Sequence, residues 1–137
     1  MKIVSACLAG VKCNFEGKSK PCQKVIELVK KGKAIPVCPE QLGGLPTPRI
    51  PSEIRDDRVV TKEGDDVTSF FQKGGEEAFR IASLVKCTEA IMKARSPSCG
   101  SGYVYDGTFS GMLREGDGIF TTKLKKKNIK VFTEEEI

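Results

Sequence analysis

Four short apolar segments predict the strands of a sheet. Residues 3–6, 34–37, 89–94 and 130–132 have the length of buried strands rather than that of helices. Pro36 is unusual within the second segment, because proline cannot donate a hydrogen bond to a neighbouring strand. A further short segment, residues 58–61, is typical of an edge strand.

Between these segments, apolar residues recur at helical spacing. Residues 21–31 form the first predicted helix, which has a proline in its first turn. A second helix begins after an aspartate cap at residue 65 or 66 and runs to about residue 85. The Gly-Gly pair at 74–75 predicts a kink or a break in it. A third helix is predicted over residues 117–127.

Strands that alternate with helices favour an α/β fold with a mostly parallel, Rossmann-like sheet. We therefore predict a single three-layer domain over residues 1–137. An Asp-Gly pair between residues 103–105 and 108–110 predicts a small hairpin. Residues 38–57 hold four of the seven prolines, and we predict an ordered functional loop there.

The composition narrows the class of protein. Hydrophobic residues make up 39% of the chain and charged residues 30%, which is typical of a folded domain. No apolar run approaches the ~20 residues of a membrane span, and no secretory signal is recognisable, so we expect a cytoplasmic protein without membrane association. The net charge of +5 is a mild bias towards anionic partners. The lysines of segment 123–130 suit a helix end, with phosphate contact as the alternative.

The chain has no histidine and six cysteines, and both counts limit the kind of catalytic or metal site it can form. Without histidine, Ser-His and Cys-His catalysis and histidine-ligated zinc are excluded. Cysteines in a cytosolic chain of this size indicate metal or redox work rather than disulfides, and zinc or an iron–sulfur cluster suits ligation by cysteine alone. The sequence has no CxxC pair, which weakens a zinc-ribbon or thioredoxin-like interpretation.

Three of the cysteines follow predicted strands. Cys7 follows the first strand, Cys38 follows the second, and Cys99 lies in the loop after the third. Carboxyl ends of parallel strands meet at one edge of a sheet, where ligands bind, so we expect these thiols to converge. Three thiolates suit an iron–sulfur cubane with one iron free of protein ligands; three separately buried cysteines are the alternative.

The other three cysteines have different places. Cys13 lies in the loop after the first strand and is a candidate fourth ligand or redox neighbour. Cys22 lies in a first helical turn. Cys87 precedes a strand, which puts it at the opposite edge of the sheet, where burial as a small apolar side chain explains it.

Polar and flexible residues accompany the cysteines. Glu40 follows Cys38 by two residues, and Ser96 and Ser98 precede Cys99. Further along the loop after Cys38, Gly43, Gly44 and Arg49 are predicted to bind substrate. The glycines let the backbone approach a ligand closely, and the arginine can clamp an anion or a carbonyl group. A cap for Glu40 and a surface ion pair for Arg49 are the structural alternatives.

Several of these segments resemble the thiouracil desulfidase family. They are SACLAG at 5–10, VCPEQLGGLPTPR at 37–49, GDDVT at 64–68, RSPSCGSG at 95–102 and YDGTFSG at 105–111. The resemblance extends from about residue 3 to residue 133. Its CPE-x-x-GGLPTPR and SPSCG motifs are long and specific.

The resemblance implies a 4Fe-4S cluster held by Cys7, Cys38 and Cys99, with the fourth iron open. It also implies removal of sulfur from thiolated pyrimidines such as 2- or 4-thiouracil without net redox change, giving uracil and sulfide. Glu40 and either Ser96 or Ser98 correspond to the catalytic carboxylate and hydroxyl, and Glu40 would activate the attacking water. Relatives with an added domain act on thiouridine in tRNA, so tRNA is a further candidate partner.

The sequence departs from the family pattern at three places. Ala9 stands where many members have leucine, and NFEG at 14–17 replaces R-Y-D-G. Ala94 stands where some members have serine. Loss of the arginine and the phenol is expected to change contacts with the substrate, and Ala94 removes a hydroxyl that would be needed for free thiouracil if it is the catalytic one.

Two other functions fit the same residues. A sulfide carrier with an iron–sulfur cluster would pass sulfide to another enzyme without turnover of thiouracil. A structural zinc protein or RNA-binding module would use the basic C-terminal segment for phosphate contacts. Metal analysis and turnover measurements separate these alternatives.

Overall fold

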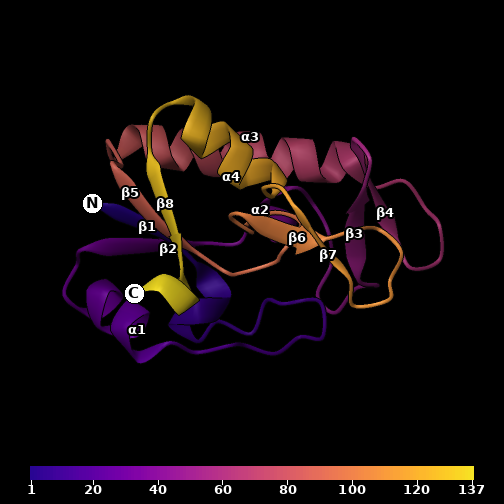
Figure 1. The fold of residues 1–137 in the computed structure, drawn as a ribbon. Coiled ribbons are helices and arrows are strands. Elements are labelled where there is room, and N and C mark those ends of the chain that lie inside the picture. The colour runs from indigo at the N-terminus through magenta and orange to yellow at the C-terminus, as the bar shows by residue number, and fades with distance from the viewer.

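Four parallel strands form the central sheet of the computed structural model, which describes residues 1–137 (Figure 1). They are β1 (Lys2–Ser5), β2 (Ala34–Val37), β5 (Glu89–Met92) and β8 (Lys130–Thr133), in the order β2-β1-β5-β8. All three pairings are parallel, which confirms the predicted α/β fold. Because β2 is an edge strand, Pro36 is tolerated in it.

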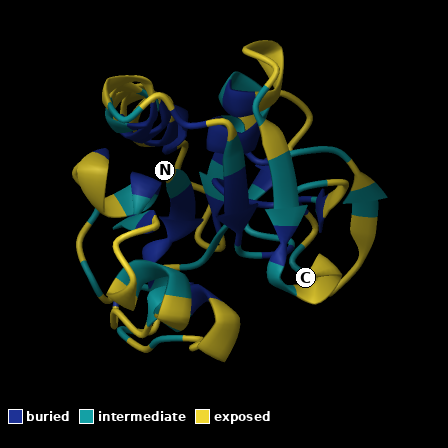
Figure 2. Ribbon diagram, turned by 90° about the vertical axis from the view of Figure 1, so that its left-hand side faces the viewer, coloured by how far each residue is buried: buried dark blue, intermediate teal, exposed yellow.

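Helices cover both faces of this sheet, which confirms the three layers. Helix α1 (Gln23–Lys30) packs on one face, while α3 (Thr68–Leu84) and α4 (Ile119–Lys126) pack on the other. Successive strand residues supply the two cores, since side chains alternate across a strand. Val4 contributes to the α1 side, and its neighbour Ile3 contributes to the α3 and α4 side. Figure 2 shows the strands as the mostly buried layer between exposed helix faces.

The Gly-Gly pair does not break α3, which runs from Thr68 to Leu84 as one helix, so the predicted break between two helices is wrong. Gly74 instead allows a close crossing with α2 (Pro39–Leu42), because an added Cβ would lie 1.8 Å from the Pro39 carbonyl oxygen. Gly43, just after α2, is equally confined: its Cβ would lie 2.0 Å from the Phe70 carbonyl oxygen. The glycines serve backbone contact between two helices and leave the hydrogen bonding of α3 intact.

Two antiparallel hairpins flank the sheet. Strand β3 (Ser52–Arg55) pairs with β4 (Arg58–Thr61), which confirms the predicted strand at 58–61. The stretch 38–57 is therefore more regular than predicted, because it contains both α2 and β3.

The second hairpin joins β6 (Tyr103–Tyr105) to β7 (Leu113–Glu115), so the predicted pairing with 108–110 is wrong. Residues 106–110 form hydrogen bonds among themselves, including Thr108 N to Asp106 Oδ1 at 3.0 Å. They make a wide loop instead of a two-residue turn.

Turns of 3-10 helix follow two of the parallel strands. One is η1 (Ala6–Ala9) after β1, and the other is η2 (Glu134–Glu136) after β8. No helix in the structure is both long and apolar enough to cross a membrane.

Candidate functional site

A pocket of about 630 Å³ opens at the carboxyl ends of the parallel strands. Its walls come from Ser5 at the end of β1, from the start of α2 after β2, and from residues 93–97 after β5. The hairpins add Glu53 and Tyr105. The volume lies within the range of small-molecule sites, roughly 300–1,000 Å³. The pocket therefore occupies the edge of the sheet that the sequence indicated.

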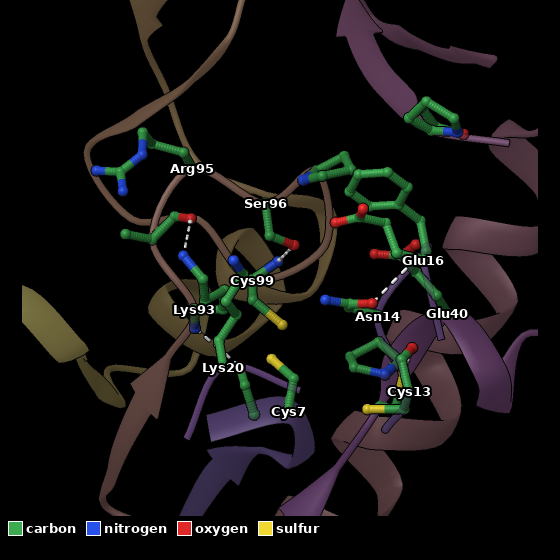
Figure 3. Close-up of a pocket in the computed structure, with 18 of the residues that line it drawn as sticks. Cys7, Cys13, Asn14, Glu16, Lys20, Glu40, Lys93, Arg95, Ser96 and Cys99 are labelled. Carbon is green, nitrogen blue, oxygen red and sulfur yellow. Dashed lines mark hydrogen bonds between the residues drawn. The ribbon is translucent and has the colours of Figure 1, made fainter. Parts of the chain in front are cut away.

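The three cysteines predicted to converge all line this pocket: Cys7, Cys38 and Cys99. Figure 3 shows the sulfur atoms of Cys7 and Cys99 pointing toward one another. Cys13 also lines the pocket. The Cys38 thiol lies 3.8 Å from the carbonyl oxygen of Cys13. Cys22 is not part of this wall.

Burial and hydrogen bonding give the thiols different acidities. Burial raises the pKa of Cys7 to about 11 and raises the pKa of Cys99 further. The pKa of Cys38 is lowered to about 7, because a hydrogen bond from the Cys13 thiol stabilises the Cys38 thiolate, and the same bond raises the pKa of Cys13. Cys38 is thus the most acidic of the pocket thiols.

The donor set fits an iron–sulfur cluster in number and chemistry. Three soft sulfur ligands from three separate loops face one cavity, and thiolate is the usual protein ligand of such clusters. A cubane distributes its ligands over several irons, so the sulfurs need not meet at one point. No three Cys, Asp or Glu side chains here are close enough to hold a single metal ion.

Glu40 is fixed at the pocket wall by two donors. It lies in the first turn of α2, where Pro39 follows the extended Cys38 and starts the helix. Its Oε1 accepts a hydrogen bond of 3.0 Å from Arg49 Nε, and its Oε2 accepts one of 3.2 Å from Ser98 Oγ. The structure therefore brings together Glu40 and Ser98, two residues predicted to be catalytic, which are 58 positions apart.

Ser96 organises the loop that carries Cys99. Its Oγ accepts hydrogen bonds from the amides of Ser98, at 3.1 Å, and Cys99, at 3.0 Å. Ser96 lines the pocket, and its hydroxyl hydrogen remains available to donate there. Ser98 is only 2% exposed and does not line the pocket, so its contact with the site passes through Glu40.

Arg49 also lines the pocket, but its guanidinium is engaged within the protein. Besides Glu40, it donates to the Cys13 carbonyl oxygen at 2.9 Å, to Thr47 Oγ1 at 2.9 Å and to the Pro46 carbonyl oxygen at 3.1 Å. Its side chain is 7% exposed. Its contacts hold the α2 carboxylate and the loop after β1 in place.

The two glycines predicted to bind substrate lie elsewhere. Gly43 and Gly44 are absent from the pocket wall and face Phe70 of α3 instead. The structure does not bring them together with the cysteines. Sequence reasoning also missed Ser5 and Lys93, which line the pocket. Both lie at the ends of strands, so the rule that selected the cysteines could have selected them too.

The departures from the family pattern fall in or near this pocket. Ala94 is 6% exposed and contributes no hydroxyl to it. The Asn14 side chain is used locally, since its Oδ1 accepts hydrogen bonds from the amides of Glu16 and Lys18 at 3.0 and 2.8 Å. Phe15 beside it is 42% exposed.

The family model of 2-thiouracil desulfurase matches residues 3–136 of the chain. The chain belongs to this family. A solved structure of a 4Fe-4S-dependent thiouracil desulfidase, TudS, resembles this desulfurase-family chain with a TM-score of 0.93 and 42% identity. The match covers 98% of the present chain and 91% of that one. Uncharacterized protein YbbK of Bacillus subtilis (strain 168) is 38% identical over 147 residues, covering 100% of the present chain and 97% of that protein. The resemblance drawn from the sequence motifs is thereby confirmed.

Proposed function

We propose that this chain hydrolyses the carbon–sulfur bond of thiouracil, giving uracil and sulfide, and that residues 1–137 act as one iron–sulfur domain. Family membership and the match to TudS support iron–sulfur-dependent desulfuration of thiouracil. The observation that carries the proposal is the shared pocket, where thiols from the loops after three parallel strands lie with the Glu40 carboxylate. Cys7, Cys38 and Cys99 are the proposed ligands of a 4Fe-4S cluster.

When bound, the cluster supplies an iron without a protein ligand, a soft Lewis acid that prefers the thiocarbonyl sulfur to the oxygen of uracil. Cys13 lines the same pocket, and the Cys38 thiol lies 3.8 Å from the Cys13 carbonyl oxygen, so we assign Cys13 as a neighbour of the proposed ligand Cys38 rather than as a fourth ligand.

Glu40 is the proposed base. Each of its oxygens accepts one hydrogen bond from the protein and keeps a second lone pair for a water molecule. Arg49 and Ser98 hold the carboxylate in one orientation, so that it takes a proton from water directed at the ring carbon. The hydroxyl of Ser96 donates to the ring edge, where negative charge develops as water adds.

The test is anaerobic purification with cluster reconstitution, followed by iron and sulfide analysis and a thiouracil turnover assay. We expect about four irons per chain and release of both uracil and sulfide. Glu40→Gln should keep its iron and lose roughly 10²- to 10⁴-fold in kcat, as is typical when a general base is removed. Glu63→Gln, on an exposed turn, is the matched control. Full turnover by Glu40→Gln would show that the base is wrongly assigned.

The same preparation separates the alternatives. A sulfide carrier would take up sulfide without releasing uracil. A chain specific for tRNA would desulfurate thiouridine in tRNA but not the free base. A protein that binds zinc and takes up no iron would contradict the proposed function.

A further inference from the structure

Side chains from both neighbouring strands take over the backbone hydrogen bonding where β5 ends. β5 lies between β1 and β8 in the sheet. The amide of Lys93 donates to Ser5 Oγ, at the end of β1, at 2.8 Å. The amide of Ala94 donates to Glu134 Oε1, just after β8, at 2.7 Å. Where the chain leaves the sheet, the amides of Lys93 and Ala94 therefore donate to two side chains instead of to the backbone of a neighbouring strand.

The carboxylate of Glu134 holds both sides of the turn at Ala94. Its Oε2 forms an ion pair with Lys93 Nζ at 3.0 Å, and these side chains are only 17% and 23% exposed. Lys93 Nζ in turn donates to the Ala94 carbonyl oxygen at 3.2 Å. Figure 3 shows the Lys93 side chain directed away from the sulfur atoms of Cys7 and Cys99. Both polar groups of Ala94 are thus fixed through one carboxylate.

The three consecutive glutamates of η2 have separate contacts. Glu135 forms a bidentate pair with Arg95, at 2.8 and 3.0 Å. Glu136 closes a capping box by accepting from the amide of Thr133 at 2.7 Å, which fixes the turn itself. The C-terminal turn leaves β8 at the same edge of the sheet as the turn after β1 (Figure 1).

The segment that these contacts hold has an unfavourable backbone conformation. Arg95 has a φ of 67°, in the left-handed region that long side chains rarely adopt. This bend directs the chain from β5 into Ser96 and Cys99, which line the pocket. A segment bent in this way keeps its position only where the surrounding contacts determine it.

Building on the proposed function, we infer that Glu134 is a positioning residue for this site. It acts through Lys93 and Ala94 and sets the placement of Ser96 and Cys99. Glu134 itself does not line the pocket, so it does not touch a ligand there.

Three variants test the inference. Glu134→Ala removes both contacts, Glu134→Gln keeps an acceptor for the Ala94 amide but loses the ion pair, and Glu63→Ala is a control without a hydrogen bond or ion pair from its side chain. The cluster-loaded proteins are compared for kcat, for KM, for the rate of iron loss to a chelator and for the midpoint of thermal unfolding.

We expect Glu134→Ala to lower kcat and to speed iron loss by roughly 10-fold each, as is typical when a residue that orients metal ligands is removed. KM should change much less, and Glu134→Gln should be intermediate in both kcat and iron loss. A variant with wild-type kcat and wild-type iron loss would overturn the inference. So would a lower unfolding midpoint alone, since it would indicate a purely structural role. If loaded wild-type protein does not desulfurate thiouracil, the proposed function fails, while the iron-loss rates still decide the role of Glu134.

Discussion

Cys87 and Cys99 are alike in burial but lie at opposite edges of the sheet. They are 8% and 5% exposed and belong to the same apolar cluster, and burial raises the pKa of both thiols. Cys87 precedes β5, and its sulfur lies 3.0 Å from the Glu89 carbonyl oxygen. Cys99 follows β5 and lines the pocket. Burial and acidity therefore do not distinguish a candidate ligand from a core cysteine here, whereas position relative to the strand ends does.

Exchanging serine for each cysteine should give the largest difference between the two edges. We expect Cys99→Ser to lose nearly all cluster iron, because a hydroxyl is a poor ligand for iron in such clusters. Cys87→Ser should keep about four irons per chain. Iron and sulfide analysis after anaerobic reconstitution measures both. Equal iron loss in the two variants would remove the distinction between the edges.

A substitution of Arg49 tests whether this pocket residue supports Glu40 or binds the substrate directly. Arg49→Lys keeps the charge but loses the planar group that reaches Glu40 and the Cys13 carbonyl oxygen together. We expect roughly 10-fold lower kcat with iron content unchanged, as is common when supporting hydrogen bonds are lost. Arg80→Lys, on the exposed face of α3, is the control. A selective rise in KM would instead favour direct binding of substrate by Arg49.

Gly43 lies on the side of the site that faces α3 rather than the pocket. Gly43→Ala should lower the free energy of unfolding by about 1–3 kcal/mol, because the added Cβ would clash with the Phe70 carbonyl oxygen. Turnover per folded molecule should stay near that of wild type. Denaturant unfolding and KM are measured together. Unchanged stability with a raised KM would restore Gly43 as a substrate-binding residue.

Asp66 does not line the pocket and should give the smallest effect. Hydrogen bonding by Thr68, and then pairing with Arg58, lowers the pKa of Asp66 from 3.8 to about 2. The folded state therefore gains stability from the ionised carboxylate above about pH 4, and this gain is lost as the pH falls through about 2.

Asp66→Asn should accordingly be slightly less stable than wild type at pH 7, with a difference that shrinks on acidification. Thermal unfolding between pH 7 and pH 2 measures it. A constant difference across this range would contradict the assigned pKa, and turnover at pH 7 should not change.

The parallel sheet and the cysteine trio could be predicted because they depend on local pattern. Apolar segments of strand length identify β1, β2 and β5, and the ends of parallel strands then place Cys7, Cys38 and Cys99 together. Both steps use only neighbouring residues and a general rule of topology.

The supporting contacts could not be predicted, because they join residues that the sequence separates. Arg49 reaches Cys13 across 36 positions, and Glu134 reaches Ala94 across 40. An arginine that donates four hydrogen bonds inside the protein has the same sequence appearance as one that is free to bind an anion. The contact between Gly43 and α3 likewise depends on how two helices cross.

The close crossing of α2 and α3 determines which parts of the pocket wall can tolerate substitution. Gly74 of α3 contacts the backbone of Pro39, and Gly43 after α2 contacts the backbone of Phe70, so neither position has space for a larger side chain. The part of the pocket wall that carries Glu40 is therefore fixed in shape. Tyr105 of β6 and Gly111 of the following loop also line the pocket, but Gly111 has a φ of 81°, which favours glycine. A library designed to enlarge the range of accepted substrates should therefore vary Tyr105 and leave α2 and the glycines of the β6–β7 loop untouched.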